Sequence, residues 1–414
     1  MKFHGDWLPE ATQRFRIIEE VFRHTCLLHG YGEVRTPVIE KLHWFTGAGI
    51  LSPDLMNKIY TFLDWDGWSG ERVVLRPDNT VPVCRLFSQY FEKKGKSRLF
   101  YIEDVFRYDE KEKIGGRHCQ MGVELLGNFP QAPVRDVEIL TLLFNFLTDL
   151  KLGRPRIVLG HAGILHSWLK SLNLSESEES MAFDLLLEGR TRELRRFCEG
   201  RTSLEGLNRL LELRGSSRAF LTNLKSLGKL STDFTKTVGE LETIARYLET
   251  LGYPFEIFPG IHKDLTYYTG LMFDIYLDEI QIGGGGRYDS LLEKFTGKKI
   301  GGSGFSIYVE PLMEFMKIGK EKPSIVPLVF LKANLDREEI ALQAMKTAAT
   351  LRKRGLAVRI LSKKERPKAG GMVAEIGKAK GGFVLKAGSG RGKETFPLPL
   401  KSVKKLLTFW GIKR

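Results

Sequence analysis

Three side chains that could bind a small charged molecule fall within one predicted hairpin. An apolar run from Leu99 to Val105 is typical of a buried strand, and a second strand-like run begins near Gln120, after a charged turn that contains glycine. Arg107 falls where the first strand leaves the core, and Gln120 and Glu124 are spaced so that both face one side of a sheet. A cation, an amide and a carboxylate on one surface suit a zwitterionic ligand or a nucleotide. The same pattern also fits an ordinary hairpin with a solvated, charged face.

A second group of polar residues follows the apolar run at Val73 and Val74. The segment VVLRPDNTVPVCR predicts a strand and then the start of a helix. Asp78 and Thr80 are residue types that cap helices, and a carboxylate is stabilised at the positive end of a helix. From the residues alone, a structural cap explains this segment as well as a binding role does.

Several stretches resemble the class II aminoacyl-tRNA synthetases of the histidyl type. FRYDE followed by GRHCQMGVELLG is similar to their motif 2, and LRPDNT occupies the place of their LRPEGT. HKDLTYYTG and GGGGRYDSLL resemble the two histidine-specific signatures, in the expected order, and GFSIYVEPL falls where motif 3 belongs. GYGEVRTPVIE resembles motif 1, which forms the dimer interface in that family. The resemblance covers residues 4–316 and is weaker beyond them.

The resemblance implies a pocket for histidine. Side chains of the types found there can bind an ammonium, a carboxylate and an imidazole. The resemblance maps these positions onto the pocket: Asp78, Asn79, Thr80, Arg107, Gln120, Glu124, Lys263, Tyr267 and Tyr268.

The phosphate side of the family's site is altered in this sequence. Adenylation needs cations on the α-phosphate and on the leaving pyrophosphate, and planar guanidinium groups serve best. Of three such arginines in the family, Arg107 is retained, Lys263 replaces the second, and Pro311 stands in place of the third. We therefore expect no catalytic residues, no cofactor and no metal.

LRPD followed by one residue and a threonine is more similar to the regulatory subunit of ATP phosphoribosyltransferase, a non-catalytic relative of the synthetases. This resemblance implies a protein that joins a short-form catalytic subunit in the first step of histidine biosynthesis. It also implies histidine as a feedback effector and a homodimer formed through the synthetase-like core.

Two other functions remain open. A divergent histidyl-tRNA synthetase is favoured by the net charge of +14 and by a C-terminal domain, and opposed by LRPD, Lys263 and Pro311. A tRNA-sensing paralogue would use the Lys- and Gly-rich segment 363–393, although we do not expect tRNA as a partner.

The length of 414 residues predicts two or three domains. We expect an α+β fold, with a class II synthetase-like antiparallel sheet flanked by helices, a helical insertion and a small C-terminal α/β domain. The predicted boundaries are 1–173 and 251–318 for the core, 174–250 for the insertion, and 322–414 for a degenerate anticodon-binding-like domain. Residues 11–29 and Val134–Leu150 predict amphipathic helices, Glu33–Ile39 an edge strand because of Pro37, and residues 363–393 a mobile segment.

Apolar runs and cysteine spacing indicate the cellular compartment of the protein. No apolar run is long enough to span a bilayer, and the N-terminal residues lack the apolar stretch of a signal peptide. The four cysteines have no metal-ligand spacing and are expected as reduced thiols, so we predict a cytoplasmic protein.

Overall fold

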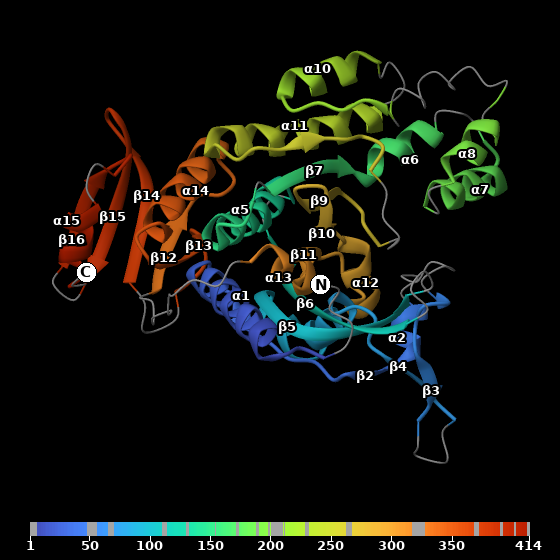
Figure 1. Cartoon of the computed structure of the whole chain (residues 1–414). Helices are drawn as coiled ribbons and strands as arrows, with labels where there is room; N and C mark the ends of the chain where they lie inside the picture. Colours follow the sequence, from blue (N-terminus) through green and yellow to red (C-terminus); the bar gives the residue numbers. More distant parts are fainter. Residues whose placement is uncertain are drawn as a thin grey trace.

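A large mixed sheet organises the chain (Figure 1). The computed structural model describes residues 6–47, 56–64, 70–109, 114–129, 132–153, 155–170, 174–187, 190–197, 199, 210, 212–227, 232–261, 267–316, 328–367, 372–389, 392–400 and 403–411. Eight strands pair in the order β1-β5-β6-β11-β10-β9-β7-β8. Their bounds are β1 (Gly32–Glu33), β5 (Lys96–Asp109), β6 (Ile114–Gly127), β7 (Pro155–His161), β8 (Glu256–Ile257), β9 (Leu271–Leu277), β10 (Ile280–Arg287) and β11 (Gly301–Tyr308). Only the outermost pairs, β1–β5 and β7–β8, are parallel, so the expected antiparallel sheet is confirmed.

Strands β5 and β6 form the predicted hairpin, which pairs from Lys96–Gly127 to Asp109–Ile114. Residues 110–113 of its turn lie outside the described residues. Because side chains alternate across a strand, Met121, Val123 and Leu125 of β6 enter one hydrophobic cluster. Leu126, from the opposite face, enters the other. The sheet therefore separates an apolar side from the side that carries the candidate residues.

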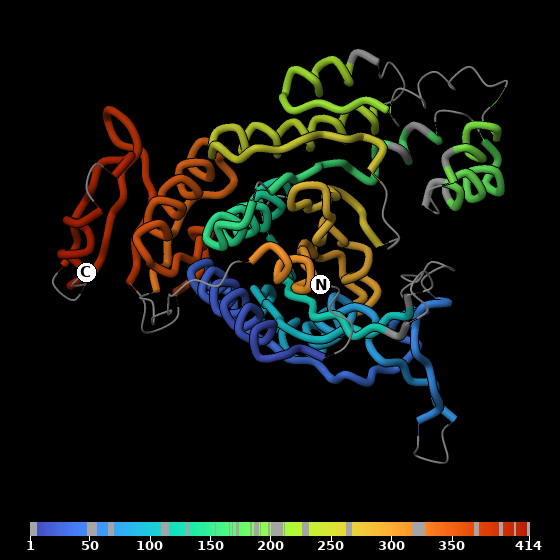
Figure 2. The backbone as a smooth tube through the Cα atoms, viewed as in Figure 1, coloured from blue at the N-terminus to red at the C-terminus, as the bar shows by residue number. Residues whose placement is uncertain are grey.

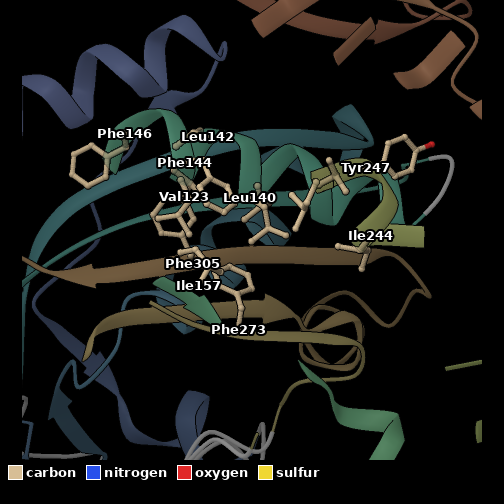
Figure 3. Packing of buried hydrophobic residues seen from close by; sticks show 14 of the residues in the cluster. Val123, Leu140, Leu142, Phe144, Phe146, Ile157, Ile244, Tyr247, Phe273 and Phe305 are labelled. Carbon is tan, nitrogen blue, oxygen red and sulfur yellow. The ribbon is translucent and has the colours of Figure 1, made fainter. Parts of the chain in front are cut away.

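Helices α1 (Pro9–Leu28) and α5 (Ala132–Leu150) cover the apolar face of the sheet. Pro9 begins α1, as its fixed φ favours at a helix start. Phe22 of α1 makes edge contacts with the rings of Phe100, Phe146 and Phe305. Figure 3 shows the same core further along the sheet, where residues of α5 meet Val123, Ile157, Phe273 and Phe305. Both amphipathic helices expected from the sequence are confirmed.

The opposite face is covered by smaller elements. A three-stranded sheet has the order β2-β4-β3. The elements on this side are β2 (Ile39–Lys41), α2 (Leu42–Thr46), β3 (Thr61–Leu63), β4 (Arg72–Leu75), α4 (Thr80–Leu86), η1 (Phe87–Phe91), η2 (Glu92–Lys94) and α12 (Asp289–Thr296). The expected edge strand Glu33–Ile39 is wrong: β1 and β2 take only its two ends. Pro37 lacks the N–H that a continuous strand would need, and it lies in the irregular chain between them.

Between strands β7 and β9 the described part of the chain is mainly helical and includes the short strand β8. Its elements include α6 (Ala162–Lys170), α7 (Glu176–Leu187), α8 (Thr191–Phe197), α10 (Arg218–Leu227) and α11 (Thr232–Leu251). Helix α11 packs on α5 and α6, whereas α7 and α8 pack together and extend away from the sheet in Figure 2. The exact boundaries of this insertion remain a prediction.

A separate five-stranded sheet near the C-terminus has the order β13-β12-β14-β15-β16. Its elements are β12 (Leu328–Ala333), α14 (Glu338–Arg352), β13 (Ala357–Ser362), β14 (Met372–Ala379), β15 (Gly382–Ser389), β16 (Gly392–Pro397) and α15 (Val403–Phe409), preceded by α13 (Val309–Phe315). The expectation of a mobile 363–393 segment is wrong for its described residues. Ala374, Ile376, Leu385 and Ala387 alternate with more exposed residues and supply the buried face of a β-meander.

Buried arginines join this sheet to the core. The Arg98 guanidinium pairs with Glu138 at 2.7 Å and donates to the carbonyl of Ile360 at 3.1 Å. Arg359 donates to the carbonyl of Gly30 at the end of α1. Among the described residues, no helix is long and apolar enough to cross a membrane.

Candidate amino-acid binding site

Strand β6 presents Gln120 and Glu124 on the side of the sheet opposite α1 and α5. Each side chain is 1% exposed. Glu124 pairs with Leu99 on β5 and with Gly304 on β11, and Gln120 lies opposite Tyr308. A Cβ at position 304 would lie 1.9 Å from Glu124 Oε2, so the glycine makes the space that this carboxyl occupies. The predicted shared face of Gln120 and Glu124 is therefore a closed interior surface and not a solvated one.

The segment between β4 and α4 brings three of the predicted residues to this surface. Asp78 Oδ1 accepts hydrogen bonds from the backbone N–H groups of Thr80 at 2.8 Å and Val81 at 3.4 Å. Asn79 donates to Gln120 Oε1 through its backbone N–H at 3.2 Å and its side-chain amide at 3.0 Å. The carboxylate thus does cap the start of α4, while Asn79 ties the helix start to β6. The segment therefore caps the helix and also places its polar residues at the candidate site.

Tyrosines enclose the Glu124 carboxyl. The Tyr288 hydroxyl donates a hydrogen bond to Glu124 Oε2. Tyr267 packs against Tyr268 with ring centroids 4.7 Å apart and against Tyr288 at 5.6 Å. Three of the buried atoms that make no hydrogen bond of ordinary geometry among the described residues lie at this site: Glu124 Oε1, the Tyr101 hydroxyl and Asn79 Oδ1. Buried polar atoms normally have partners, so these three are available to a polar ligand.

Burial dominates the electrostatics of the site. It raises the pKa of Glu124 well above the ordinary value, although the nearby hydroxyls of Tyr288, Thr80 and Tyr101 act in the opposite direction. Burial also raises the pKa of Asp78, opposed by the charge of Arg107 and by the backbone donors of Val81 and Thr80. A cationic group that entered the site would favour the ionised form of both acids.

Strand β10 supplies residues that the sequence alone misplaced or missed. From the sequence, the glycine run Gly283–Gly286 predicts a turn that a ligand could approach closely, but these residues lie within β10. A Cβ at Gly283 would meet the backbone of β11 at 2.2 Å, and one at Gly286 would meet the Tyr268 ring at 2.7 Å. The glycines make room for protein and not for a ligand. Tyr288, two residues after Gly286 in the quoted GGGGRYD signature, and Tyr101 on β5 were absent from the predicted set.

The phosphate side holds fewer cations. Arg107, half-buried at the end of β5, donates through Nε to the Pro77 carbonyl at 2.7 Å. Pro311 lies in the first turn of α13, where a proline is tolerated. Its neighbour Glu310 accepts a hydrogen bond from the backbone N–H of Cys119 at 2.8 Å. Where the family places an arginine, this chain has Pro311, and the neighbouring Glu310 carboxyl is held against β6.

Other predicted residues are placed only in part. Lys263 lies outside the described residues. Within the described part of the chain, no group of three or more His, Cys, Asp or Glu side chains could hold a metal. Cys26, Cys84 and Cys119 are buried free thiols, and Cys198 lies outside the described residues.

Comparison with known proteins is consistent with this geometry. A family model described as histidyl-tRNA synthetase matches residues 4–312. A protein of Dehalococcoides mccartyi named "ATP phosphoribosyltransferase regulatory subunit" is 36% identical over 311 residues, which cover 75% of each chain. A protein of Metallosphaera sedula named "Histidine--tRNA ligase" is 32% identical over 385 residues, covering 89% of this chain and 86% of the other. A solved structure from Bacillus halodurans, titled as an ATP phosphoribosyltransferase regulatory subunit/histidyl-tRNA synthetase, matches with a TM-score of 0.66 and 25% identity, covering 89% and 94% of the two chains.

Proposed function

The chain belongs to the histidyl-tRNA synthetase family and is 36% identical to a protein named as an ATP phosphoribosyltransferase regulatory subunit, and we propose that it is such a regulatory subunit and has no catalytic activity of its own. It would act with a short-form catalytic subunit in the first step of histidine biosynthesis. It would also make that step responsive to histidine, in the cytoplasm where we expect it to reside.

One observation supports this function above the others: the two halves of the site have diverged to different degrees. Asp78, Gln120 and Glu124 converge, buried, on one surface, as an amino-acid pocket requires. At the phosphate side, by contrast, the cation expected from α13 is replaced by Pro311 beside the Glu310 carboxyl. Binding an amino acid needs only the first half, whereas adenylating it needs both.

A divergent histidyl-tRNA synthetase is the second candidate. In its favour, the match to a ligase extends over 89% of this chain and therefore into the C-terminal region. Against it stands the same loss of cations. The exchange assay described in the Discussion separates these two functions.

Histidine is the effector that we propose for the pocket. Its cationic group would pair with Glu124, and its polar atoms would meet the buried groups that now lack partners, including Asn79 Oδ1 and the Tyr101 hydroxyl. Thr80, Tyr267, Tyr268, Arg107 and Lys263 complete the proposed set. Two arguments support histidine as the ligand of this site: the chemistry of its side chains and the family to which the chain belongs.

We expect Glu124→Gln to weaken histidine binding by about 2–3 kcal/mol, because a charged hydrogen-bond partner is lost inside a closed site. Isothermal titration calorimetry of both proteins measures this change. Since burial raises the pKa of Glu124, binding of a cation should release a proton. Wild-type affinity should therefore increase as the pH rises above the ordinary glutamate value, and this dependence should be reduced in the variant. Equal affinities in the two proteins would place the histidine site elsewhere.

Assembly with a catalytic subunit is the second expectation. Because the pocket catalyses no reaction, histidine bound there can have an effect only by changing the activity of a partner enzyme. We expect motif 1 and α1 to form a homodimer, whose symmetry would also be the symmetry of the complex. We expect co-elution with a short-form ATP phosphoribosyltransferase in gel filtration, a rise in its activity, and inhibition by histidine. With a net charge of +14, association should weaken as salt is added.

A paired experiment makes the assembly test decisive. The catalytic subunit alone and the mixture are assayed at the same protein concentration, first at low and then at high salt. Separate elution together with unchanged phosphoribosyltransferase activity would refute the regulatory role, even if the chain binds histidine.

A further inference from the structure

A cavity of about 370 Å³ lies at the end of the large sheet opposite the hairpin turn. It is bounded by the end of β6, the start of α5, helix α12 and the segment that leads into β11. We call it the Arg135 cavity; the lining residues that matter are Phe129, Arg135, Asp289, Glu293, Lys299 and Gly301. None of them belongs to the proposed histidine site.

Arg135 makes this cavity a prepared site. Its side chain is 4% exposed, Nε donates to Ser303 Oγ at 2.9 Å, and Nη2 donates to Asp289 at 2.6 Å. Among the described residues, Nη1 has no hydrogen-bond partner. A Cβ at Gly301 would lie 1.2 Å from Nη1, so this glycine leaves the space in which Nη1 reaches the cavity wall. A fixed, buried guanidinium thus has one donor group to offer.

The remaining charges select the ligand class. Lys299 is exposed, Glu293 is half-buried, and neither has an ion-pair partner in the described part of the chain. The wall therefore carries two cations, Arg135 and Lys299, and two carboxylates, Glu293 and Asp289. A phosphate would be repelled by the two carboxylates, and a simple amine would be repelled by the two cations. A zwitterion can place its negative group near the cations and its positive group near the carboxylates.

We propose that the Arg135 cavity binds a free α-amino acid. The ligand carboxylate would accept hydrogen bonds from Arg135 Nη1 and Lys299, and its ammonium group would lie between Glu293 and Asp289. The side chain of the ligand would pack against Phe129. The volume fits a small molecule of this kind. This site does not depend on what the Glu124 site binds.

The cavity also touches two other parts of the protein. Asp289 follows Tyr288, which holds Glu124. On the other side, the Phe129 ring lies 5.4 Å from Lys96 Nζ and from the Arg98 guanidinium. Lys96 pairs with Glu365, and Arg98 donates to Ile360, so both reach the C-terminal sheet. An occupant would thus lie between the histidine site and that sheet.

The test uses the full-length Glu124→Gln protein, so that the first site is weakened. The twenty L-amino acids, inorganic phosphate and methylamine are each titrated and followed by thermal shift and calorimetry. We expect at least one amino acid to bind. Its affinity should fall about tenfold or more in Lys299→Ala and in Glu293→Ala, since each removes one charged partner. Lys298→Ala, which removes the adjacent lysine paired with Glu92, is the matched control and should leave the affinity unchanged.

Three results would overturn the proposal. The first is that no amino acid binds the Glu124→Gln protein. The second is binding that is the same in Lys299→Ala, Glu293→Ala and Lys298→Ala. The third is phosphate or methylamine binding more tightly than every amino acid. The variants change two exposed lysines and one half-buried glutamate, so loss of the fold does not confuse the result. None of these outcomes bears on activation of a phosphoribosyltransferase.

Discussion

Purified protein is expected to show no histidine-dependent exchange of pyrophosphate into ATP. Each electrostatic donor to a transition state of this type contributes on the order of 10²–10³ in rate. Pro311 removes one such donor and Lys263 weakens another, because a lysine does not form the bidentate contacts of an arginine. The combined loss should leave the rate below detection.

The structure adds a second reason for this expectation. Glu310, beside Pro311, has its Oε2 atom buried without a hydrogen-bond partner among the described residues, and burial raises the pKa of its carboxyl. Whether protonated or not, this group supplies no positive charge to a phosphate. Arg107, the retained arginine, is already engaged with the Pro77 carbonyl.

Two measurements make the exchange assay interpretable. Calorimetry with histidine on the same preparation establishes that the pocket is folded, and an authentic histidyl-tRNA synthetase serves as the positive control. Exchange at an ordinary synthetase rate would restore the divergent synthetase as the function. Detectable histidine binding with no exchange is the result that the regulatory role requires.

The sequence predicted best where one local pattern determined one structure. The hairpin of β5 and β6 follows from two apolar runs around a charged turn, and the period of two in a strand correctly placed Gln120 and Glu124 on one face. Proline at a helix start correctly marked α1. These features depend on neighbours in the chain.

The errors concern contacts between distant segments. Nothing local distinguishes a glycine that admits a ligand from one that admits the next strand, so Gly283–Gly286 were misassigned. The Lys- and Gly-rich composition of 363–393 concealed the alternation that buries Ile376 and Leu385. Tyr101 and Tyr288 become site residues only because β5 and the end of β10 both reach Glu124, although the GGGGRYD signature could have indicated Tyr288.

A buried charge network beneath the site supports the second large effect. Arg287 Nη2 donates to Asp136 at 2.9 Å and to Glu240 at 2.9 Å, and Ser303 Oγ donates to Asp136 at 2.8 Å. The side chains of Arg287 and Asp136 are 8% and 0% exposed. Hydrogen bonding from His161, together with Arg287, lowers the pKa of Glu240 to about 2. Strand β10, helix α5 and helix α11 are thus joined through one guanidinium.

We expect Arg287→Met to lower the free energy of unfolding by about 3–5 kcal/mol, because Asp136 would remain buried with Ser303 Oγ as its one remaining side-chain donor among the described residues. Urea unfolding followed by circular dichroism measures the change. Arg190→Met is the matched control: this arginine pairs with Glu193 at the surface, with side chains 48% and 49% exposed, so its removal should leave the free energy of unfolding close to that of the wild type.

A double variant tests the cause of this loss. If the uncompensated Asp136 charge is responsible, Asp136→Leu combined with Arg287→Met should recover much of the stability, since a buried ion pair replaced by apolar side chains is often close to neutral. Because Tyr288 is the next residue after Arg287 and holds Glu124, the single variant should also bind histidine more weakly. If Arg287→Met unfolded at the same midpoint urea concentration as the wild type, Asp136 would not need Arg287 as a hydrogen-bond and charge partner. The network would then not be what positions strand β10 beneath the site.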